Sequence, residues 1–184
     1  MFLIPTGGLR HLTAILLCLG LAACNEPAAE APAGPVAFHP DDECHVCGMV
    51  ISELPGPKGE AVEASGAVKK FCSVQEMFVW WLQPENRNLN VTLYVHDMTR
   101  SEWNHPDDRH LIDAKKAYYV VGSDLKGAMG VTLASFADRL AAEGMATARG
   151  GQVLRWDEIG LEQLQMMHTG NDGHAGHSGH GTAH

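Results

Sequence analysis

Sulfur and imidazole groups are concentrated in the six-residue stretch Cys-His-Val-Cys-Gly-Met at positions 44–49. Thiolates and thioethers are soft ligands, and such ligands favour Cu(I) over hard cations. In an extended chain Cys47 and Met49 point to the same face, because side chains alternate along a strand. Gly48 leaves room for a turn there, and Cys44 is close enough in sequence to approach Cys47. The stretch therefore predicts a Cu(I) site.

The same spacing fits two other kinds of site. A Cys-x-x-Cys pair in an oxidising compartment can form a disulfide, either structural or redox-active. It can also supply half of a zinc site, although a second cysteine pair is missing and only Cys72 and scattered histidines remain. Cys72 lies at a predicted strand-to-helix junction, where a thiol can be reactive, but we interpret it as a buried structural cysteine. The spacing of Cys44 and Cys47 leaves metal binding and a disulfide open.

A second pair of metal-binding residue types, His96 and Met98, stands at the end of a predicted strand. The two residues share a face if the strand continues, and Asp97 then faces the other way or orients an imidazole. If this strand neighbours positions 44–49, both groups converge on one ion. A low-coordinate set of sulfur and imidazole ligands favours Cu(I), because Cu(II) prefers tetragonal nitrogen and oxygen donors. The candidate metal ligands are therefore Cys44, Cys47, Met49, His96 and Met98.

The N-terminus has the features of a bacterial lipoprotein signal. Residues 1–23 contain a short apolar run after Arg10, and Leu-Ala-Ala at 21–23 precedes Cys24. We expect cleavage before Cys24 and lipidation of its sulfur, which anchors the chain to a membrane on the periplasmic side. The anchor would lie in the inner leaflet of the outer membrane or the outer leaflet of the cytoplasmic membrane. Residues 24–42, rich in Ala, Pro and Glu, are predicted to be a flexible tether.

Composition separates a folded domain from a tail and excludes one class of partner. The 184 residues include 13 Lys and Arg against 22 Asp and Glu, a formal net charge of -9, which argues against nucleic acid. We assign residues 43–167 to one domain. Residues 168–184 form a tail in which histidines alternate with small residues, a composition typical either of a metal-collecting tract or of an inert segment.

Apolar patterning predicts a mixed α+β domain with helices on a mainly antiparallel sheet. Ser73, with Glu76 three residues later, predicts the start of a helix that ends before Pro84. A second helix is predicted from Thr132 to Gly144, and Asp157 is predicted to cap a short last helix. Both halves then have the order strand–strand–helix–strand, which we interpret as an internal duplication. Predicted strands cover residues 48–51, 60–64, 68–72, 91–96, 117–122 and 152–156.

These motifs together resemble the NosL family, the accessory lipoproteins of nitrous oxide reductase maturation. The resemblance rests on the lipobox at Cys24, Cys-Gly-Met at 47–49, His-Asp-Met at 96–98, Met129 with Gly130, and a Gly-Gly turn into the last strand. It covers most of residues 43–165, so that the tether and the His-rich tail lie outside it.

The resemblance implies a Cu(I) chaperone rather than an enzyme. Its recipient would be nitrous oxide reductase, in particular the copper–sulfide centre, acting with the associated membrane transporter complex. It implies Cys47, Met49 and Met98 as ligands, joined by Cys44 and His96, and a duplicated fold like that of organomercurial lyase. Two alternatives are a thiol–disulfide oxidoreductase that uses the Cys-x-x-Cys pair and an organomercurial-lyase-like thiol enzyme.

Overall fold

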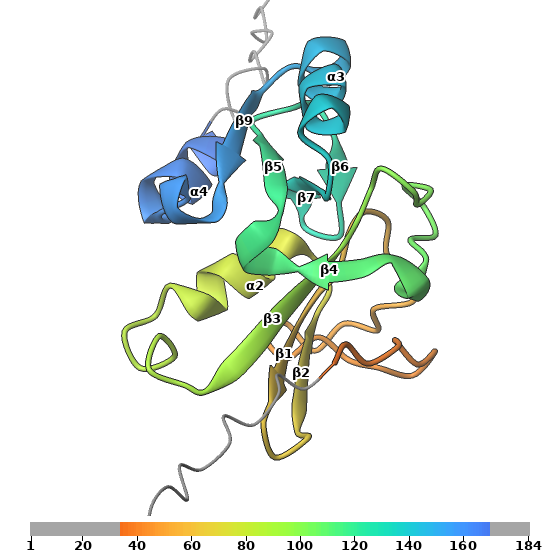
Figure 1. Cartoon of the computed structure of the whole chain (residues 1–184), viewed down its shortest axis with the longest axis vertical. Helices are drawn as coiled ribbons and strands as arrows, with labels where there is room; N and C mark the ends of the chain where they lie inside the picture. The colour runs from red at the N-terminus through yellow and green to blue at the C-terminus, as the bar shows by residue number, and fades with distance from the viewer. Residues whose placement is uncertain (1–33, 170–184) are drawn as a thin grey trace, which may run out of the picture. The chain divides into compact units, whose positions relative to one another are not determined.

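The computed structural model describes residues 34–169, and Figure 1 shows how their helices and strands are arranged. The predicted signal peptide at 1–23, the lipidation site Cys24 and the histidines of the predicted tail from His174 onward lie outside the described residues. Within residues 34–169, no helix has the length and apolar character needed to cross a membrane.

The first sheet has four antiparallel strands in the order β2-β1-β3-β4. A tight turn at Gly66, whose φ is 86°, connects the first two strands. The central strand β1 is buried along most of its length, because one of its neighbours covers each edge and a helix covers one face. The strands are β1 (Gly59–Glu63), β2 (Val68–Phe71), β3 (Val91–His96) and β4 (Leu111–Asp113).

Helix α2 (Val74–Trp81) begins where the sequence predicts it. The Ser73 hydroxyl accepts the backbone N–H of Glu76 at 3.1 Å, which satisfies one of the free donors of the first turn. The apolar face of α2 includes Met77, which is fully buried. Met77 lies so close to Gly59 of β1 that a Cβ added at Gly59 would be 2.7 Å from the Met77 sulfur. Close contact with the sheet thus holds the start of α2 in place.

The second sheet has three antiparallel strands in the order β8-β5-β9, beside a short hairpin of β6 and β7. In both sheets the first strand in sequence pairs antiparallel with two later strands, β1 with β2 and β3, and β5 with β8 and β9. The strands of this sheet and hairpin are β5 (Tyr118–Val121), β6 (Lys126–Gly127), β7 (Gly130–Val131), β8 (Ala134–Phe136) and β9 (Gln152–Arg155). Three 3-10 turns also occur in the domain: η2 (Asp108–His110), η3 (Ala114–Lys116) and η4 (Trp156–Glu158).

The predicted second helix, from Thr132 to Gly144, is wrong in its position. Residues 134–136 form strand β8, and helix α3 (Arg139–Arg149) starts only after Asp138, whose carboxylate accepts the N–H of Ala141 at 2.8 Å. The apolar spacing that suggested one helix is shared between a buried strand and an exposed helix face, and the Leu140 side chain is 75% exposed.

Two further element boundaries differ from the sequence-based expectation. The predicted strand at 48–51 is a turn with one isolated bridge between Glu43 and Val50, because Gly48 takes a φ of 70° that interrupts an extended chain. Asp157 lies inside η4, and the last helix, α4 (Leu161–Thr169), starts later than predicted.

The largest core cluster joins the two sheets through α2. The Phe78 ring of α2 packs edge-on against that of Tyr119 of β5, with ring centroids 5.2 Å apart. The Phe78 ring is also tilted against that of Trp156, with ring centroids 4.4 Å apart. Tyr119 is fully buried and donates its hydroxyl to the carbonyl of Ala114 at 2.6 Å. The start of α2, where the cysteines gather, is therefore fixed by contacts with both halves of the domain.

The last part of the predicted tether is attached to the domain by hydrogen bonds. The backbone N–H of Val36 donates to the Glu60 carboxylate at 2.8 Å, and that of Phe38 donates to Asp108 at 2.7 Å. Lys70 forms an ion pair with Asp42. The ordered domain thus includes residues before position 43, where the sequence suggested that it begins.

Candidate metal centre

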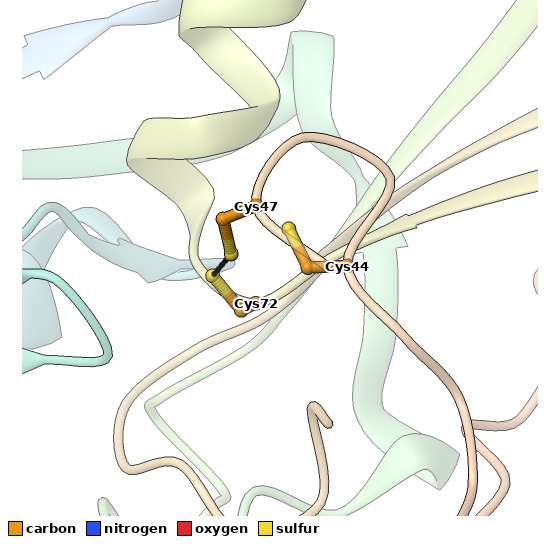
Figure 2. Close-up of side chains that lie close together, drawn as sticks. All are labelled: Cys44, Cys47 and Cys72. Carbon is orange, nitrogen blue, oxygen red and sulfur yellow. Dashed lines mark hydrogen bonds between the residues drawn. The ribbon is translucent and has the colours of Figure 1, made fainter. Parts of the chain in front are cut away.

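Three free cysteines lie together at the start of α2, and we refer to Cys44, Cys47 and Cys72 as the thiol cluster. Their sulfur atoms are all within 4.8 Å of one another, and the Sγ atoms of Cys47 and Cys72 are 3.7 Å apart. Figure 2 shows Cys44 and Cys47 on one loop that faces Cys72 at the end of a strand. Among the described residues this is the one such group of His, Cys, Asp and Glu side chains.

The loop at 44–49 is closed by its own backbone. The N–H of Gly48 donates to the carbonyl of Cys44 at 2.8 Å, and the N–H of Cys44 donates to the carbonyl of Met49 at 2.9 Å. Gly48 closes this turn with a positive φ of 70°, which other residues adopt only under strain. The turn brings Cys44 and Cys47 to the same side of the loop, in place of the extended geometry expected from the sequence.

A backbone hydrogen bond places this loop next to the third cysteine. The N–H of His45 donates to the carbonyl of Lys70 in β2 at 2.8 Å, so that the loop lies along the end of that strand. Cys72 stands between the end of β2 at Phe71 and the helix cap at Ser73. Strand pairing and helix capping therefore fix the position of Cys72 independently of the loop.

The three thiols differ in burial. Cys44 is 3% exposed and Cys72 is fully buried, whereas Cys47 is exposed. The two buried cysteines pack with Ile51, and Phe38 covers the same small core cluster. An ion held by the cluster would thus have an apolar interior on one side and solvent on the other.

The thiols of Cys44 and Cys72 share a proton unequally. A hydrogen bond from the Cys72 thiol lowers the pKa of Cys44, helped by backbone N–H groups that include that of Cys47, while burial acts in the opposite direction. The same hydrogen bond and burial raise the pKa of Cys72. One thiolate is therefore available near neutral pH before any metal arrives, and thiolate is the form that binds metal.

A buried lysine lies near the cluster. The Lys58 ammonium donates to the carbonyls of Leu54, Pro55 and Gly56, the last two at 3.1 and 2.7 Å. Burial lowers the pKa of Lys58 to about 8, and the electrostatic effect of Cys72 opposes this shift. Lys58 thus fixes the loop beside the cluster and adds positive charge near its sulfur atoms.

Sulfur separations in the thiol cluster are suitable for one soft metal ion. Thiolate–metal bonds of about 2.3 Å place two sulfur ligands of one ion at most about 4.6 Å apart. The distance from Cys47 to Cys72 is well inside this limit, and the widest separation in the cluster, within 4.8 Å, requires a shift of a few tenths of an ångström. Three soft ligands around one ion favour Cu(I) among the biological copper states.

Of the five predicted ligands, the structure brings Cys44 and Cys47 together. Met49 lies on the same loop and is 37% exposed. His96 is buried, and both its ring nitrogens have partners: Nδ1 accepts the N–H of Lys58 at 3.1 Å, and Nε2 is 2.9 Å from the Asp108 carboxylate. Met98 packs in a different core cluster from Cys44.

Cys72 was predicted to be a buried structural cysteine and is not among the five predicted ligands. Cys72 is fully buried as expected, but its sulfur belongs to the thiol cluster. Its place directly before the helix cap at Ser73 was the available signal, because a strand-to-helix junction presents a side chain to the helix N-terminus. The sequence does not predict the hydrogen bond from the His45 N–H to the Lys70 carbonyl, and this hydrogen bond brings the loop to that junction.

Comparison with known proteins adds to this geometry. A family model described as NosL matches residues 35–164. The chain belongs to the NosL family. It is 58% identical over 168 residues to the "Copper-binding lipoprotein NosL" of Stutzerimonas stutzeri, covering 89% of this chain and 88% of that protein. It is 37% identical over 152 residues to the protein of the same name from Achromobacter cycloclastes, covering 80% and 78%.

A solved NosL structure has the same fold. The crystal structure of the copper chaperone NosL from Shewanella denitrificans superposes with a TM-score of 0.67 at 45% sequence identity, covering 70% of this chain and 96% of that one. This similarity confirms the mixed α+β class with antiparallel sheets. The NosL match begins at residue 35, close to the hydrogen bond that attaches Val36 to the domain.

Proposed function

We propose that this chain is a membrane-anchored, periplasm-facing chaperone that binds Cu(I) and delivers it for assembly of the copper–sulfide centre of nitrous oxide reductase, together with the associated membrane transporter complex. The observation that carries the proposal is the thiol cluster, whose free sulfur atoms lie within 4.8 Å of one another. The related proteins are named for copper binding and chaperone action, and they support a protein that transfers metal rather than an enzyme.

The residue types in the thiol cluster support Cu(I) as the proposed oxidation state. Thiolates are soft donors that stabilise the monovalent ion, and nitrogen and oxygen donors are absent from the group formed by Cys44, Cys47 and Cys72. Met49 adds an exposed thioether on the same loop, two residues from Cys47. His96 and Met98 join this ligand set only if His96 gives up a ring hydrogen bond and Met98 leaves its core contacts.

The anchor is the lipidated Cys24 that follows the signal peptide at 1–23. Two relatives are named as lipoproteins, which supports this assignment. Membrane attachment raises the local concentration of the chaperone near membrane partners. In cells grown with a labelled fatty acid, the wild-type chain should carry the label and Cys24→Ala should not, and an unlabelled wild-type chain would contradict the anchor.

The shared order of the two sheets supports an internal duplication of a strand–strand–helix–strand unit. β1 lies between β2 and β3, as β5 lies between β8 and β9. On this proposal the copper site belongs to the first unit, with α2 as its support, and the second unit contributes to the core under α2.

The decisive experiment is a Cu(I) titration of the reduced full-length chain against a competing chelator. Wild type is compared with Cys44→Ser, Met49→Ala, Met98→Ala and a chain that ends at Thr169. We expect one tightly bound Cu(I) that is lost in Cys44→Ser and kept after tail deletion. Loss of binding only on tail deletion would locate the copper in the His-rich tail and refute the proposed site.

A second experiment tests delivery. In a denitrifying cell that lacks this chain, nitrous oxide reductase should accumulate without its copper–sulfide centre, and the wild-type chain should restore it. A Cys44→Ser chain that is stably produced should fail to do so. Full restoration by Cys44→Ser would mean that maturation does not depend on copper held by the thiol cluster.

A further inference from the structure

The thiol cluster spans the boundary between core and solvent. Cys72 is fully buried and Cys44 is 3% exposed, whereas Cys47 is exposed on the loop. The sulfur of Cys47 nevertheless points inward and lies 3.7 Å from that of Cys72, as Figure 2 shows. A single short side chain therefore connects the buried sulfurs with the surface.

The two buried sulfurs are also the better fixed. Cys72 lies between the paired strand β2 and the capped helix α2, and it packs in the same small core cluster as Cys44. Cys44 forms backbone bonds through both its N–H and its carbonyl, to Met49 and Gly48. Cys47 is the exposed member of the cluster. It is therefore the thiol that can turn towards solvent while the other two stay in place.

We propose that the cluster divides the handling of Cu(I) between its thiols, with Cys44 and Cys72 as the retaining ligands and Cys47 as the ligand through which the ion enters and leaves. This inference rests on the proposed Cu(I)-binding function. It adds Cys72 to the ligand set and gives Cys47 a role distinct from that of Cys44.

The transfer step is a ligand exchange without a change of oxidation state. A soft ligand of the recipient first forms a bond to Cu(I) on its exposed side, next to Cys47. The bonds to the buried sulfurs then break, and each sulfur keeps the electron pair of its bond to the ion. Cu(I) leaves while bound to Cys47 and the incoming ligand, and the Cys47 bond breaks last.

The surface next to Cys47 is suited to such an exchange. Met49, two residues away, is 37% exposed and offers a weaker thioether, while Val46 and Val50 are 45% and 38% exposed. A copper ion that moves outward thus passes from buried thiolates to an exposed thiolate and then to a neutral sulfur. Affinity falls along this path, because neutral thioethers bind less strongly than charged thiolates.

The test measures affinity and transfer rate separately on the full-length chain in detergent, reduced and loaded with one equivalent of Cu(I). Affinity is taken from competition with a Cu(I) chelator at equilibrium. Transfer is followed by stopped flow, as the rate at which a bulky, bidentate Cu(I) chelator removes the ion. The variants are Cys44→Ser, Cys72→Ser and Cys47→Ser, and Glu53→Gln on the exposed surface is the control.

Removal of an outer-shell partner of a metal typically lowers affinity by about 10–100-fold. We expect Cys44→Ser and Cys72→Ser to lose more than this and to release copper faster than wild type. Cys47→Ser should keep most of its affinity yet release copper at least about tenfold more slowly, because the chelator no longer has a reachable first sulfur. In Cys47→Ser the ion would thus be bound less tightly and yet released more slowly. A general loss of structure does not produce this combination, because it would lower affinity and speed release.

Two outcomes would overturn the inference: wild-type affinity in Cys72→Ser, or release from Cys47→Ser that is faster in proportion to its lost affinity. Circular dichroism of the copper-free variants shows whether each is folded, and Cys72→Ala replaces Cys72→Ser if the buried hydroxyl unfolds the chain. If wild type itself binds no Cu(I), the proposed function fails. If wild type binds and the three variants behave alike, only the division of roles fails.

Discussion

Glu60 provides a prediction that can be worked through in detail. It is a fully buried carboxylate in the central strand β1. One carboxylate oxygen accepts the N–H of Val36 at 2.8 Å, and the other has no hydrogen-bond partner among the described residues. Burial raises the pKa of Glu60 from 4.5 to about 7. The folded chain therefore holds a proton that the unfolded chain has already released over this range of pH.

The sign of the effect follows from this difference. Below pH 4.5 both states are protonated and the fold has its full stability. As the pH rises from 4.5 towards 7, the unfolded state ionises and the folded state does not, so stability falls. A shift of one pKa unit corresponds to about 1.4 kcal/mol, so the total loss is about 3 kcal/mol above pH 7.

Replacement of Glu60 by Gln removes this titration and keeps a carbonyl that can accept the Val36 N–H. The measurement is urea unfolding of the copper-free, reduced chain at several values between about pH 4 and pH 8. We expect the stability of Glu60→Gln relative to wild type to rise by about 3 kcal/mol across this range. Glu53→Gln, which changes an exposed carboxylate, is the control variant. A pH dependence for Glu60→Gln no different from that of this control would refute the assignment of a buried, protonated carboxyl in β1.

Four further substitutions test the packing of the domain by urea unfolding. Lys58→Met removes a buried ammonium that binds three backbone carbonyls and should cost about 2–4 kcal/mol; an effect under half a kilocalorie would show that solvent reaches those carbonyls. Gly59→Ala places a Cβ 2.7 Å from the sulfur of Met77 and should cost about 1–3 kcal/mol, whereas no change would mean that α2 moves freely. Leu140→Ala should change stability by less than about 0.5 kcal/mol and Leu133→Ala should cost about 2–5 kcal/mol, and equal effects would contradict the structure of α3.

The fold could be predicted where local chemistry alone determines it. Ser73 with Glu76 identified the start of α2, and the β-branched run at 91–96 identified β3 with its observed bounds. The region from 132 to 140 could not be resolved in this way, because a short buried strand and an amphipathic helix give similar apolar spacing over so few residues. Asp138 was the cap that separated the two elements.

The candidate site could be predicted only in the part that one short segment encodes. The motif at 44–49 identified Cys44 and Cys47, because both lie in a single turn. Cys72 joins them through packing of the loop on β2, which depends on contacts between residues far apart in the sequence. The buried hydrogen bonds of His96 likewise depend on Lys58 and Asp108, which approach it only in the folded domain.

The most direct test of the copper site is X-ray absorption at the copper edge of the full-length chain loaded with one equivalent of Cu(I). The thiol cluster predicts a first shell of sulfur at about 2.3 Å, with fewer sulfur neighbours in Cys72→Ser. A first shell of nitrogen and oxygen alone in the wild-type chain would contradict copper binding by Cys44, Cys47 and Cys72.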